Sequence, residues 1–185
     1  MAEDKTFINI ENVVATGTLE QRIDLLEIVR IFPHVEYRPE QFPGLVYRLK
    51  KPKTATLIFS SGKMVCTGAR TGRQAKKAIM TVVDELKRNG IAIVGKPKIR
   101  VENIVASGGL GGYIDLEKCV YSLKKTMYEP EQFPGLIYRM EDPKVVMLLF
   151  STSKLVCTGA KKEADVKIAV KNLKETLESK GLIYY

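Results

Sequence analysis

The chain has 185 residues, of which 45% are hydrophobic and 28% charged, and its net charge is +9 at pH 7. This content supports a folded core, while no stretch approaches the roughly 20 apolar residues of a membrane-spanning helix, which excludes a helical membrane protein. Residues 1–5 carry no apolar signal segment, so we expect a cytoplasmic protein. Both halves of the chain are basic. A basic surface favours a polyanion such as nucleic acid as the partner, although it can also serve solubility alone.

The chain contains an internal repeat. Residues 37–48 (YRPEQFPGLVYR) recur as residues 128–139 (YEPEQFPGLIYR), an offset of 91, and three further segment pairs match without a gap: 11–15 with 102–106, 57–60 with 148–151, and 65–69 with 156–160. We therefore divide the chain into a first repeat, residues 1–94, and a second repeat, residues 95–185. A pseudo-symmetric pair of this kind suits a partner with a dyad of its own.

The first repeat begins with a predicted strand over residues 8–16 and a short helix over 25–29 that Asp24 caps. A short strand near 35–37 precedes a loop at 39–44, which its prolines and glycine exclude from regular structure. Strands follow over 45–49, 54–59 and 63–67, with turns at 50–52 and 61–62. A long amphipathic helix then carries apolar residues from Ala75 to Leu86 and ends at Asn89 and Gly90.

The second repeat predicts the same elements in the same order. Asp115 caps a helix over residues 116–121, and the final helix carries apolar residues from Val166 to Leu177 and is closed by Gly181. Each repeat is thus a strand, a helix, four strands and a helix, which predicts an antiparallel sheet with its helices on one face. Two such units side by side would form one long sheet.

Period-2 alternation predicts that neither face of this sheet is polar. The long helices should cover one face, and no segment remains to cover the other. The side chains of that other face are apolar in both repeats: Val14, Val46, Leu57, Phe59 and Val65, and their counterparts Val105, Ile137, Leu148, Phe150 and Val156. We therefore expect an external partner to cover it.

Polar and basic side chains share the same face: Asn12, Asn103, Thr67 and Thr158, with Arg48, Arg139, Lys63 and Lys154. The amides and hydroxyls can bond to the acceptors on A·T base edges in the DNA minor groove, where the amino group of guanine would be unfavourable. The basic side chains can reach phosphates. The alternative is that the asparagines only satisfy backbone groups near the centre of the sheet.

Two pairs of phenylalanines are expected beside this face. Folding the hairpin about Lys50 and Lys51 pairs positions whose numbers sum to roughly 101, which brings Phe42 next to Phe59. Phe133 and Phe150 have the same separation in the second repeat. A ring pair is usually part of a core, but two pairs beside an apolar, basic-flanked sheet suit wedges between base steps.

Catalysis and metal binding find little support in the sequence. The chain has one histidine, His34, and three cysteines, Cys66, Cys119 and Cys157, and none has metal-ligand spacing. There is no phosphate-cradling glycine loop followed by a lysine. We therefore expect no enzyme activity, no catalytic residue, no metal and no cofactor. A protein-binding module that uses the same apolar face is the alternative function.

The doubled EQFPGL segments, the LIFSSGK run at 57–63 and the paired VCTGA segments closely resemble the TATA-box-binding protein family in its archaeal form, over essentially the whole chain. The resemblance implies an α+β fold: a two-repeat saddle, whose curved ten-stranded antiparallel sheet carries four helices on its convex face. It further implies a general transcription factor that binds the minor groove of A·T-rich TATA-box promoter DNA and kinks it by phenylalanine insertion. Such a factor recruits transcription factor B and RNA polymerase for transcription initiation, and would act at the nucleoid.

Residue roles follow from the same resemblance. The intercalating rings match Phe42, Phe59, Phe133 and Phe150. The base and groove contacts match Asn12, Asn103, Thr67, Thr158, Val14, Val105, Leu57, Leu148, Val65 and Val156. The DNA backbone contacts match Arg48, Arg139, Lys63 and Lys154, and the contact with transcription factor B matches Glu129, Glu131 and Gln132.

The chain departs from the family pattern in two places. Ser153 replaces the glycine expected in the last hairpin, where Gly62 keeps it, so the two turns are expected to differ. The run from Gly108 to Gly112 is unusually rich in glycine and is expected to be mobile. Between the copies, Arg38 stands opposite Glu129, which suggests that the two loops choose different protein partners.

Overall fold

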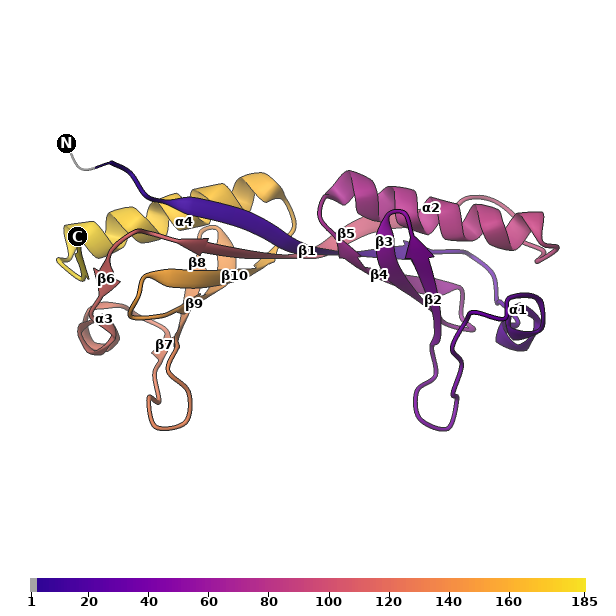
Figure 1. Ribbon diagram of the computed structural model, residues 1–185, viewed down its shortest axis with the longest axis horizontal. Coiled ribbons are helices and arrows are strands. Elements are labelled where there is room, and N and C mark those ends of the chain that lie inside the picture. The colour runs from indigo at the N-terminus through magenta and orange to yellow at the C-terminus, as the bar shows by residue number, and fades with distance from the viewer. Residues whose placement is uncertain (1–2) are drawn as a thin grey trace. The chain divides into compact units, whose positions relative to one another are not determined.

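The computed structural model describes residues 3–185, in which the chain forms four helices and a nine-stranded antiparallel sheet (Figure 1). The chain divides into two compact units. The N-repeat unit is residues 12–102, and the C-repeat unit joins the segment ending at Glu11 to residues 103–185. The predicted division at residue 94 follows the sequence repeat, whereas these units divide the first strand of each repeat after an equivalent residue, Glu11 or Glu102.

The elements of the N-repeat unit are β1 (Phe7–Thr18, from Asn12 on), α1 (Leu25–Ile31), β2 (Leu45–Lys50), β3 (Lys53–Ile58), β4 (Lys63–Ala69), α2 (Gly72–Arg88) and the start of β5 (Lys98–Gly109). Asp24 accepts hydrogen bonds from the backbone N–H groups of Leu26 and Glu27, as its predicted capping role requires. The helix α2 packs on β2, β3 and β4 through an apolar stripe that is fully buried.

The C-repeat unit repeats this plan. It contains the rest of β5, β6 (Tyr113–Ile114), α3 (Leu116–Ser122), β7 (Thr126–Met127), β8 (Leu136–Glu141), β9 (Lys144–Leu149), β10 (Lys154–Ala160), α4 (Glu163–Ser179) and β11 (Ile183–Tyr184). The strand order β5-β10-β9-β8-β7 mirrors the order β1-β4-β3-β2 of the N-repeat unit, and β6 pairs separately with β11. Within residues 3–185, none of the helices is long and apolar enough to cross a membrane.

The sheet has nine strands where the resemblance implied ten. The predicted strand near residues 35–37 makes only one isolated bridge, between Glu36 and Val46, whereas its counterpart in the C-repeat unit is the two-residue strand β7. The two repeats differ here by one ladder pair: Thr126 pairs with Tyr138 in the C-repeat unit, whereas the bridge of Glu36 with Val46 does not extend to Val35 and Tyr47.

The hairpin of β2 and β3 turns one residue later than predicted. Leu45 pairs with Ile58 and Lys50 pairs with Lys53, so Lys51 and Pro52 form the two-residue connection. Paired positions therefore sum to 103 rather than roughly 101. Phe42 lies outside the ladder on the preceding loop, which is why this shift does not separate its ring from that of Phe59.

The turns around Gly62 and Ser153 have the same backbone conformation, contrary to expectation. Both residues have positive φ, 92° and 65°, and the N–H of each donates to the carbonyl of the phenylalanine three residues earlier. Side-chain space differs: a Cβ on Gly62 would overlap the carbonyl oxygen of Gln21. In the C-repeat unit the residue equivalent to Gln21 is Gly112, and its N–H donates to Ser153 Oγ at 3.0 Å. The serine is therefore accommodated by the glycine-rich run.

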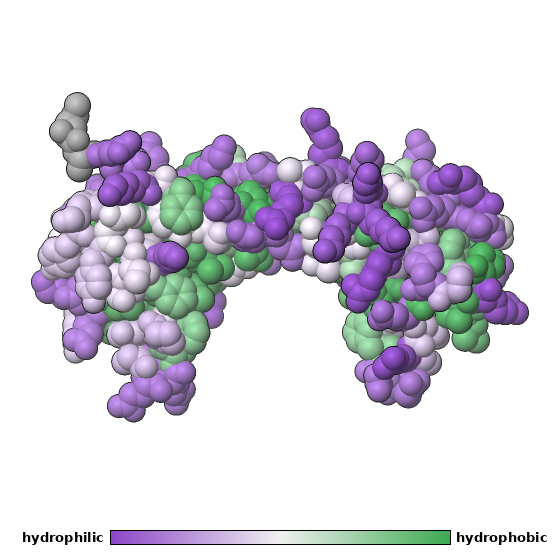
Figure 2. All heavy atoms as spheres, in the orientation of Figure 1, coloured by the Kyte–Doolittle hydropathy of each residue, from purple (hydrophilic) through white to green (hydrophobic). Residues whose placement is uncertain are grey.

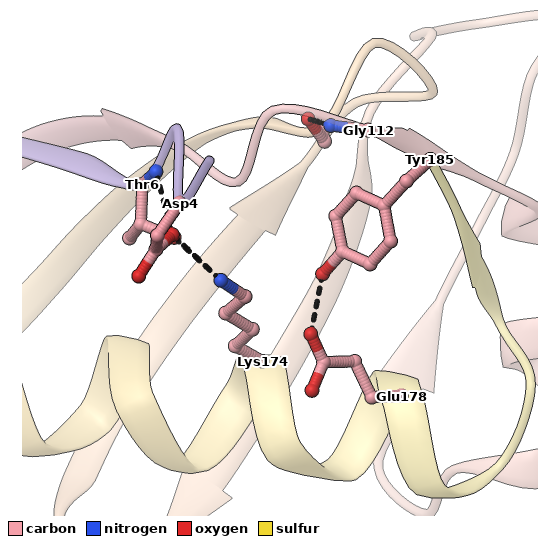
Figure 3. A network of polar contacts seen from close by, with 7 residues as sticks. Asp4, Thr6, Gly112, Lys174, Glu178 and Tyr185 are labelled. Carbon is pink, nitrogen blue, oxygen red and sulfur yellow. Dashed lines mark hydrogen bonds and ion pairs between the residues drawn. The ribbon is translucent and has the colours of Figure 1, made fainter. Parts of the chain in front are cut away.

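That run packs against neighbouring segments. Gly108 and Gly109 belong to β5 and are buried, and a Cβ on Gly111 would lie 2.5 Å from the Lys5 side chain. Residues 4–6 and Tyr185 lie on the same side of α4 as Gly112 (Figure 3). Lys174 of α4 donates to Asp4 at 2.8 Å and to the Thr6 hydroxyl at 3.0 Å, while the Tyr185 hydroxyl donates to Glu178 at 2.5 Å. The Lys174 ammonium group lowers the pKa of Asp4.

Candidate nucleic-acid interface

Each unit leaves one face of its sheet without a covering helix. Side chains alternate along the strands: Val13, Ala15, Tyr47, Ile58 and Cys66 point toward the helices and are at most 1% exposed. The other face, here called the open face, is half-exposed and largely apolar, and apolar side chains gather below the long helix of each unit in Figure 2. Folding thus leaves on each unit an apolar surface that no segment of residues 3–185 covers.

The open face carries all ten predicted groove-contact residues. Each of them is half-exposed: Asn12, Asn103, Thr67, Thr158, Val14, Val105, Leu57, Leu148, Val65 and Val156. The registers place them side by side, since Leu57 pairs with Val65 on β4 and Leu148 with Val156 on β10. Cys66 and Cys157 belong to the covered face, and burial raises the pKa of Cys157 to about 11, so neither thiol serves the open face.

A bulge fixes the orientation of Asn12. The β1–β4 register pairs Val13 with Ala69 but Ala15 with Cys66, which leaves Gly68, at φ 99°, outside the regular ladder. The Gly68 N–H donates instead to Asn12 Oδ1 at 2.7 Å, and Asn12 Nδ2 donates to Thr67 Oγ1 at 2.9 Å. Because a backbone N–H can only donate, the amide oxygen must face it.

Asn103 has the same arrangement in the C-repeat unit. Its Oδ1 accepts from the Gly159 N–H at 2.7 Å, and its Nδ2 donates to Thr158 Oγ1 at 3.2 Å. The alternative that these asparagines satisfy backbone groups therefore holds for their amide oxygens, each of which accepts from a backbone N–H. Each amide nitrogen still has a second N–H, since one hydrogen bond uses only one of its two protons.

The predicted phenylalanine pairs are present at equivalent places in the two units. The ring centroids of Phe42 and Phe59 are 5.9 Å apart and those of Phe133 and Phe150 are 6.0 Å apart, with edge-to-face geometry in both pairs. Phe42 and Phe133 are 43% and 45% exposed. A glycine is required beside each pair, because a Cβ on Gly44 would lie 2.7 Å from the Phe42 ring.

The loop that carries each exposed ring is closed by its own backbone. In the N-repeat unit the N–H groups of Gln41 and Phe42 donate to the carbonyl of Arg38, and in the C-repeat unit those of Gln132 and Phe133 donate to Glu129. The side chains of Glu129, Glu131 and Gln132 are exposed. The two loops therefore share a conformation but present different charges, with Arg38 at the position of Glu129.

All four predicted basic contacts are exposed: Arg48, Arg139, Lys63 and Lys154. Arg48 lies 3.7 Å from Glu36 in a pair that is more than half exposed, which leaves the guanidinium group accessible. Arg139 lies with Lys125, Lys144 and Lys161 around one surface hollow of the C-repeat unit. Glu141 also lines this hollow and pairs with Lys125, so the excess of positive charge comes from the other three basic side chains.

Sequence alternation missed further residues of the open face. In the C-repeat unit Glu11 accepts a hydrogen bond from Ser107 at 2.7 Å, and in the N-repeat unit Glu102 accepts from Thr16 at 3.0 Å and from Arg100 at 2.8 Å. Strict alternation from Asn12 would place Glu11 on the covered face. The alternation slips by one residue at the boundary between the units, and no residue type in the sequence marks this slip.

Comparison with known proteins agrees with this geometry. The sequence model of the family described as transcription factor TFIID (or TATA-binding protein, TBP) matches residues 7–89 and again 98–180. The TATA-box-binding protein of Sulfurisphaera tokodaii is 54% identical over 173 residues, which are 94% of this chain and 87% of that protein. That of Methanothermobacter thermautotrophicus is 50% identical over 176 residues, 95% of this chain and 97% of that protein.

A solved structure leads to the same family. TBP from Methanococcus jannaschii superposes with a TM-score of 0.84 at 47% sequence identity, covering 93% of this chain and 98% of that one. The doubled family match, the identity over nearly the full length and the shared fold together show that the chain belongs to the TATA-box-binding protein family.

Proposed function

We propose that the chain is a general transcription initiation factor that binds the minor groove of A·T-rich TATA-box promoter DNA through its open faces, without catalysing a reaction. The observation that carries this proposal is the duplicated open face, which is apolar, bordered by basic side chains and flanked by one exposed ring pair in each unit. Membership in the family supports the same reading.

Hydrogen-bond donors at the centre of each open face would read the base edges. Asn12 and Asn103 use their oxygens on the backbone, so each offers an N–H. The hydroxyls of Thr67 and Thr158 accept from those amides. The Thr67 hydroxyl can donate outward, whereas the Thr158 hydroxyl donates to Asn103 Oδ1 at 3.4 Å. A·T pairs present only acceptors in the minor groove, whereas G·C adds an amino donor. The guanine amino group and the asparagine N–H are both donors, so each would stay unpaired if they faced each other. This face therefore favours A·T pairs.

Apolar side chains around these donors would pack on the sugars that line the groove. The packing residues are Val14, Val105, Leu57, Leu148, Val65 and Val156. Burying apolar surface is worth roughly 25 cal/mol per Å² removed from water. Arg48, Arg139, Lys63 and Lys154 would contact phosphates, which positions the protein without reading sequence.

The ring pairs would act as wedges. In each pair the loop ring, Phe42 or Phe133, is exposed and stands beside a partly buried ring at a strand end, Phe59 or Phe150. Insertion between base steps costs a few kcal/mol per unstacked step and kinks the duplex, which lets more protein surface reach the groove. Deformable TA steps reduce that cost, so the wedges add selectivity where no base is contacted.

The loop of the C-repeat unit is the proposed contact for transcription factor B. Glu129, Glu131 and Gln132 are exposed on it, and the equivalent loop has Arg38 in place of Glu129. A basic partner surface would therefore select the C-repeat loop over the other by charge. Recruitment of RNA polymerase would follow from that complex.

The wedge assignment is tested with Phe59→Ala, Phe150→Ala and the double variant on a TATA-box duplex. We expect each single variant to lose about tenfold in affinity, since base–aromatic stacking contributes about 1–3 kcal/mol. The double variant should also bend the duplex less, measured by energy transfer between dyes at the duplex ends.

Leu26→Ala is the matched control, because Leu26 is 64% exposed on α1 and does not belong to the open face. Full bending by the double variant would rule out the wedges. Equal affinity of the wild-type chain for A·T-rich and G·C-rich duplexes would argue against minor-groove reading and leave a protein-binding face as the better explanation.

A further inference from the structure

Phe7 is an aromatic residue of the C-repeat open face that the sequence pattern did not single out. It begins β1 and is 47% exposed. The neighbouring Thr6 hydroxyl accepts a hydrogen bond from Lys174 of α4 and therefore points toward the helix. Successive side chains of a strand alternate between faces, so Phe7 points to the open face.

The Phe7 ring is seated on Gly109 of β5. A Cβ on Gly109 would lie 2.5 Å from Phe7 Cε1 and 3.1 Å from Cζ, so only glycine leaves room for the ring. The ring borders a hollow of about 580 Å³ whose other walls include Pro134, Phe150 and Val156, with Lys154 also lining it. Phe7 thus extends the apolar surface next to the wedge pair of this unit.

The N-repeat unit has a charged group at the equivalent position. Lys98 corresponds to Phe7, and Thr18 corresponds to Gly109. Lys98 Nζ lies 2.6 Å from Glu20 Oε1 in an exposed ion pair. The central positions of the two open faces hardly differ, because both have asparagine, threonine, leucine and valine at the groove-contact sites. The N-repeat unit thus lacks both the ring and the glycine beneath it, with Lys98 in place of Phe7 and Thr18 in place of Gly109.

We propose that Phe7 is a further groove-contacting residue that packs on deoxyribose in one half of the site and biases the direction in which the chain binds DNA. This inference rests on the proposed minor-groove function. Reversing the chain on the duplex exchanges the two units, so residues that are the same in both contribute equally to either direction. Only positions that differ, such as Phe7 and Lys98, can distinguish the directions.

The physical preferences of the two side chains predict the direction. An A-tract has a narrow minor groove with an enhanced negative potential, which attracts a lysine. Alternating TA steps deform easily, and a widened groove exposes the sugars that a phenylalanine can cover. On a duplex with one half of each kind, Lys98 should lie over the A-tract and Phe7 over the TA steps.

The test uses such a duplex and measures affinity by band shift and direction by tethered cleavage. A hydroxyl-radical probe is attached to Lys171→Cys on α4, which is exposed, whereas Cys66, Cys119 and Cys157 are fully buried. Phe7→Ala should weaken binding about fivefold to tenfold and Phe7→Leu about twofold, in proportion to the apolar area lost.

Direction is tested with Phe7→Lys, which should bring the ratio of the two cleavage patterns toward one. Combining Phe7→Lys and Gly109→Thr with Lys98→Phe and Thr18→Gly should reverse the ratio. Tyr121→Lys is the matched control, because it adds the same charge at an aromatic residue that is 90% exposed on α3, and the ratio should stay unchanged.

The inference is overturned if Phe7→Ala binds within twofold of the wild-type chain and Phe7→Lys leaves the ratio unchanged. If wild-type binding and bending depend on Phe59 and Phe150 while the Phe7 variants change nothing, this inference fails alone. If the wild-type chain does not bind the duplex, the proposed function fails and this inference fails with it.

Discussion

Hydrogen bonds from the backbone fix the orientation of the two asparagines on the open face. Asn12 is held by the N–H of a bulged glycine, and the same contact fixes Asn103. The consequence is that each amide presents only its donor side outward. Selectivity for acceptor-bearing base edges would then follow from the bulge, since a freely rotating amide could present either group.

Buried thiols are governed by desolvation instead: Cys157 lies on the covered face of the sheet and Cys119 on α3. Desolvation raises the pKa of Cys119 and Cys157 to about 11 each, from a model-compound value of 9.0. A thiol whose pKa is raised by folding stabilises the folded state below the unfolded pKa, and that contribution is lost as the pH rises through the folded pKa.

We therefore expect the free energy of unfolding to fall between about pH 9 and pH 11. Cys157→Ala should lower stability at pH 8 but make the fall with pH shallower, by up to about 1.4 kcal/mol per pH unit for one proton. Urea titrations at pH 8, 9, 10 and 11 measure both effects. Parallel curves for the two proteins would contradict the assignment.

At the scale of elements, the two repeats build the same hairpin turn from different residues. A Cβ on Gly62 would overlap the carbonyl oxygens of Leu19 and Gln21. Ser153 has the same backbone conformation, and its hydroxyl accepts a hydrogen bond from the Gly112 N–H. Each turn is therefore matched to the segment that packs on it. A substitution in one repeat cannot be judged from what the other repeat tolerates.

Gly62→Ser should lower the free energy of unfolding by about 2 kcal/mol or more, because overpacking against backbone adds to the strain of a non-glycine residue at positive φ. The matched variant Ser153→Gly should cost about 1 kcal/mol or less, the value of one hydrogen bond. Chemical denaturation measures both. Adding Glu20→Gly and Gln21→Gly to Gly62→Ser should recover part of the lost free energy of unfolding. If Gly62→Ser and Ser153→Gly lower the free energy of unfolding equally, the two turns are not matched to the segments that pack on them.

At the scale of the whole molecule, the net charge of +9 favours binding to any polyanion, and only part of it belongs to the proposed interface. Charges on the open face should enter the salt dependence of DNA binding, while those on the helices should contribute little because phosphates lie beyond their reach. The duplication doubles each contribution from the open face.

Arg48→Ala should weaken binding to TATA-box and unrelated duplexes alike and reduce the slope of log affinity against log salt by about 0.9, the value for one lost phosphate contact on B-DNA. Arg30→Ala on α1 removes the same charge away from the open face and should leave the slope unchanged. Binding isotherms at several salt concentrations measure the slope. Equal slopes for the two variants would show that Arg48 does not contact phosphate.

The sequence by itself determined the repeat, the order of elements and most of the open face. These features depend on local rules: helical periodicity from Ala75 to Leu86, strand alternation from Asn12 on, and the breaking of strands by Pro39 and Pro43. The family resemblance added the residue roles, and the comparisons bear out the family itself. The ring pairs were predicted from the hairpin fold, but the register is two positions off in the sum, and the loop before β2 brings Phe42 to Phe59.

Tertiary structure decided what depends on contacts between distant segments. The slip in alternation at Glu11 and Glu102 arises where the strand passes from one unit to the other, so no local pattern reports it. The glycine run packs against Lys5, Phe7 and Tyr184, which are far from it in the sequence. Ser153 and Phe7 are accommodated because Gly112 and Gly109 lie against them. A side chain's room is set by its neighbours in space, and those neighbours are known only once the chain has folded.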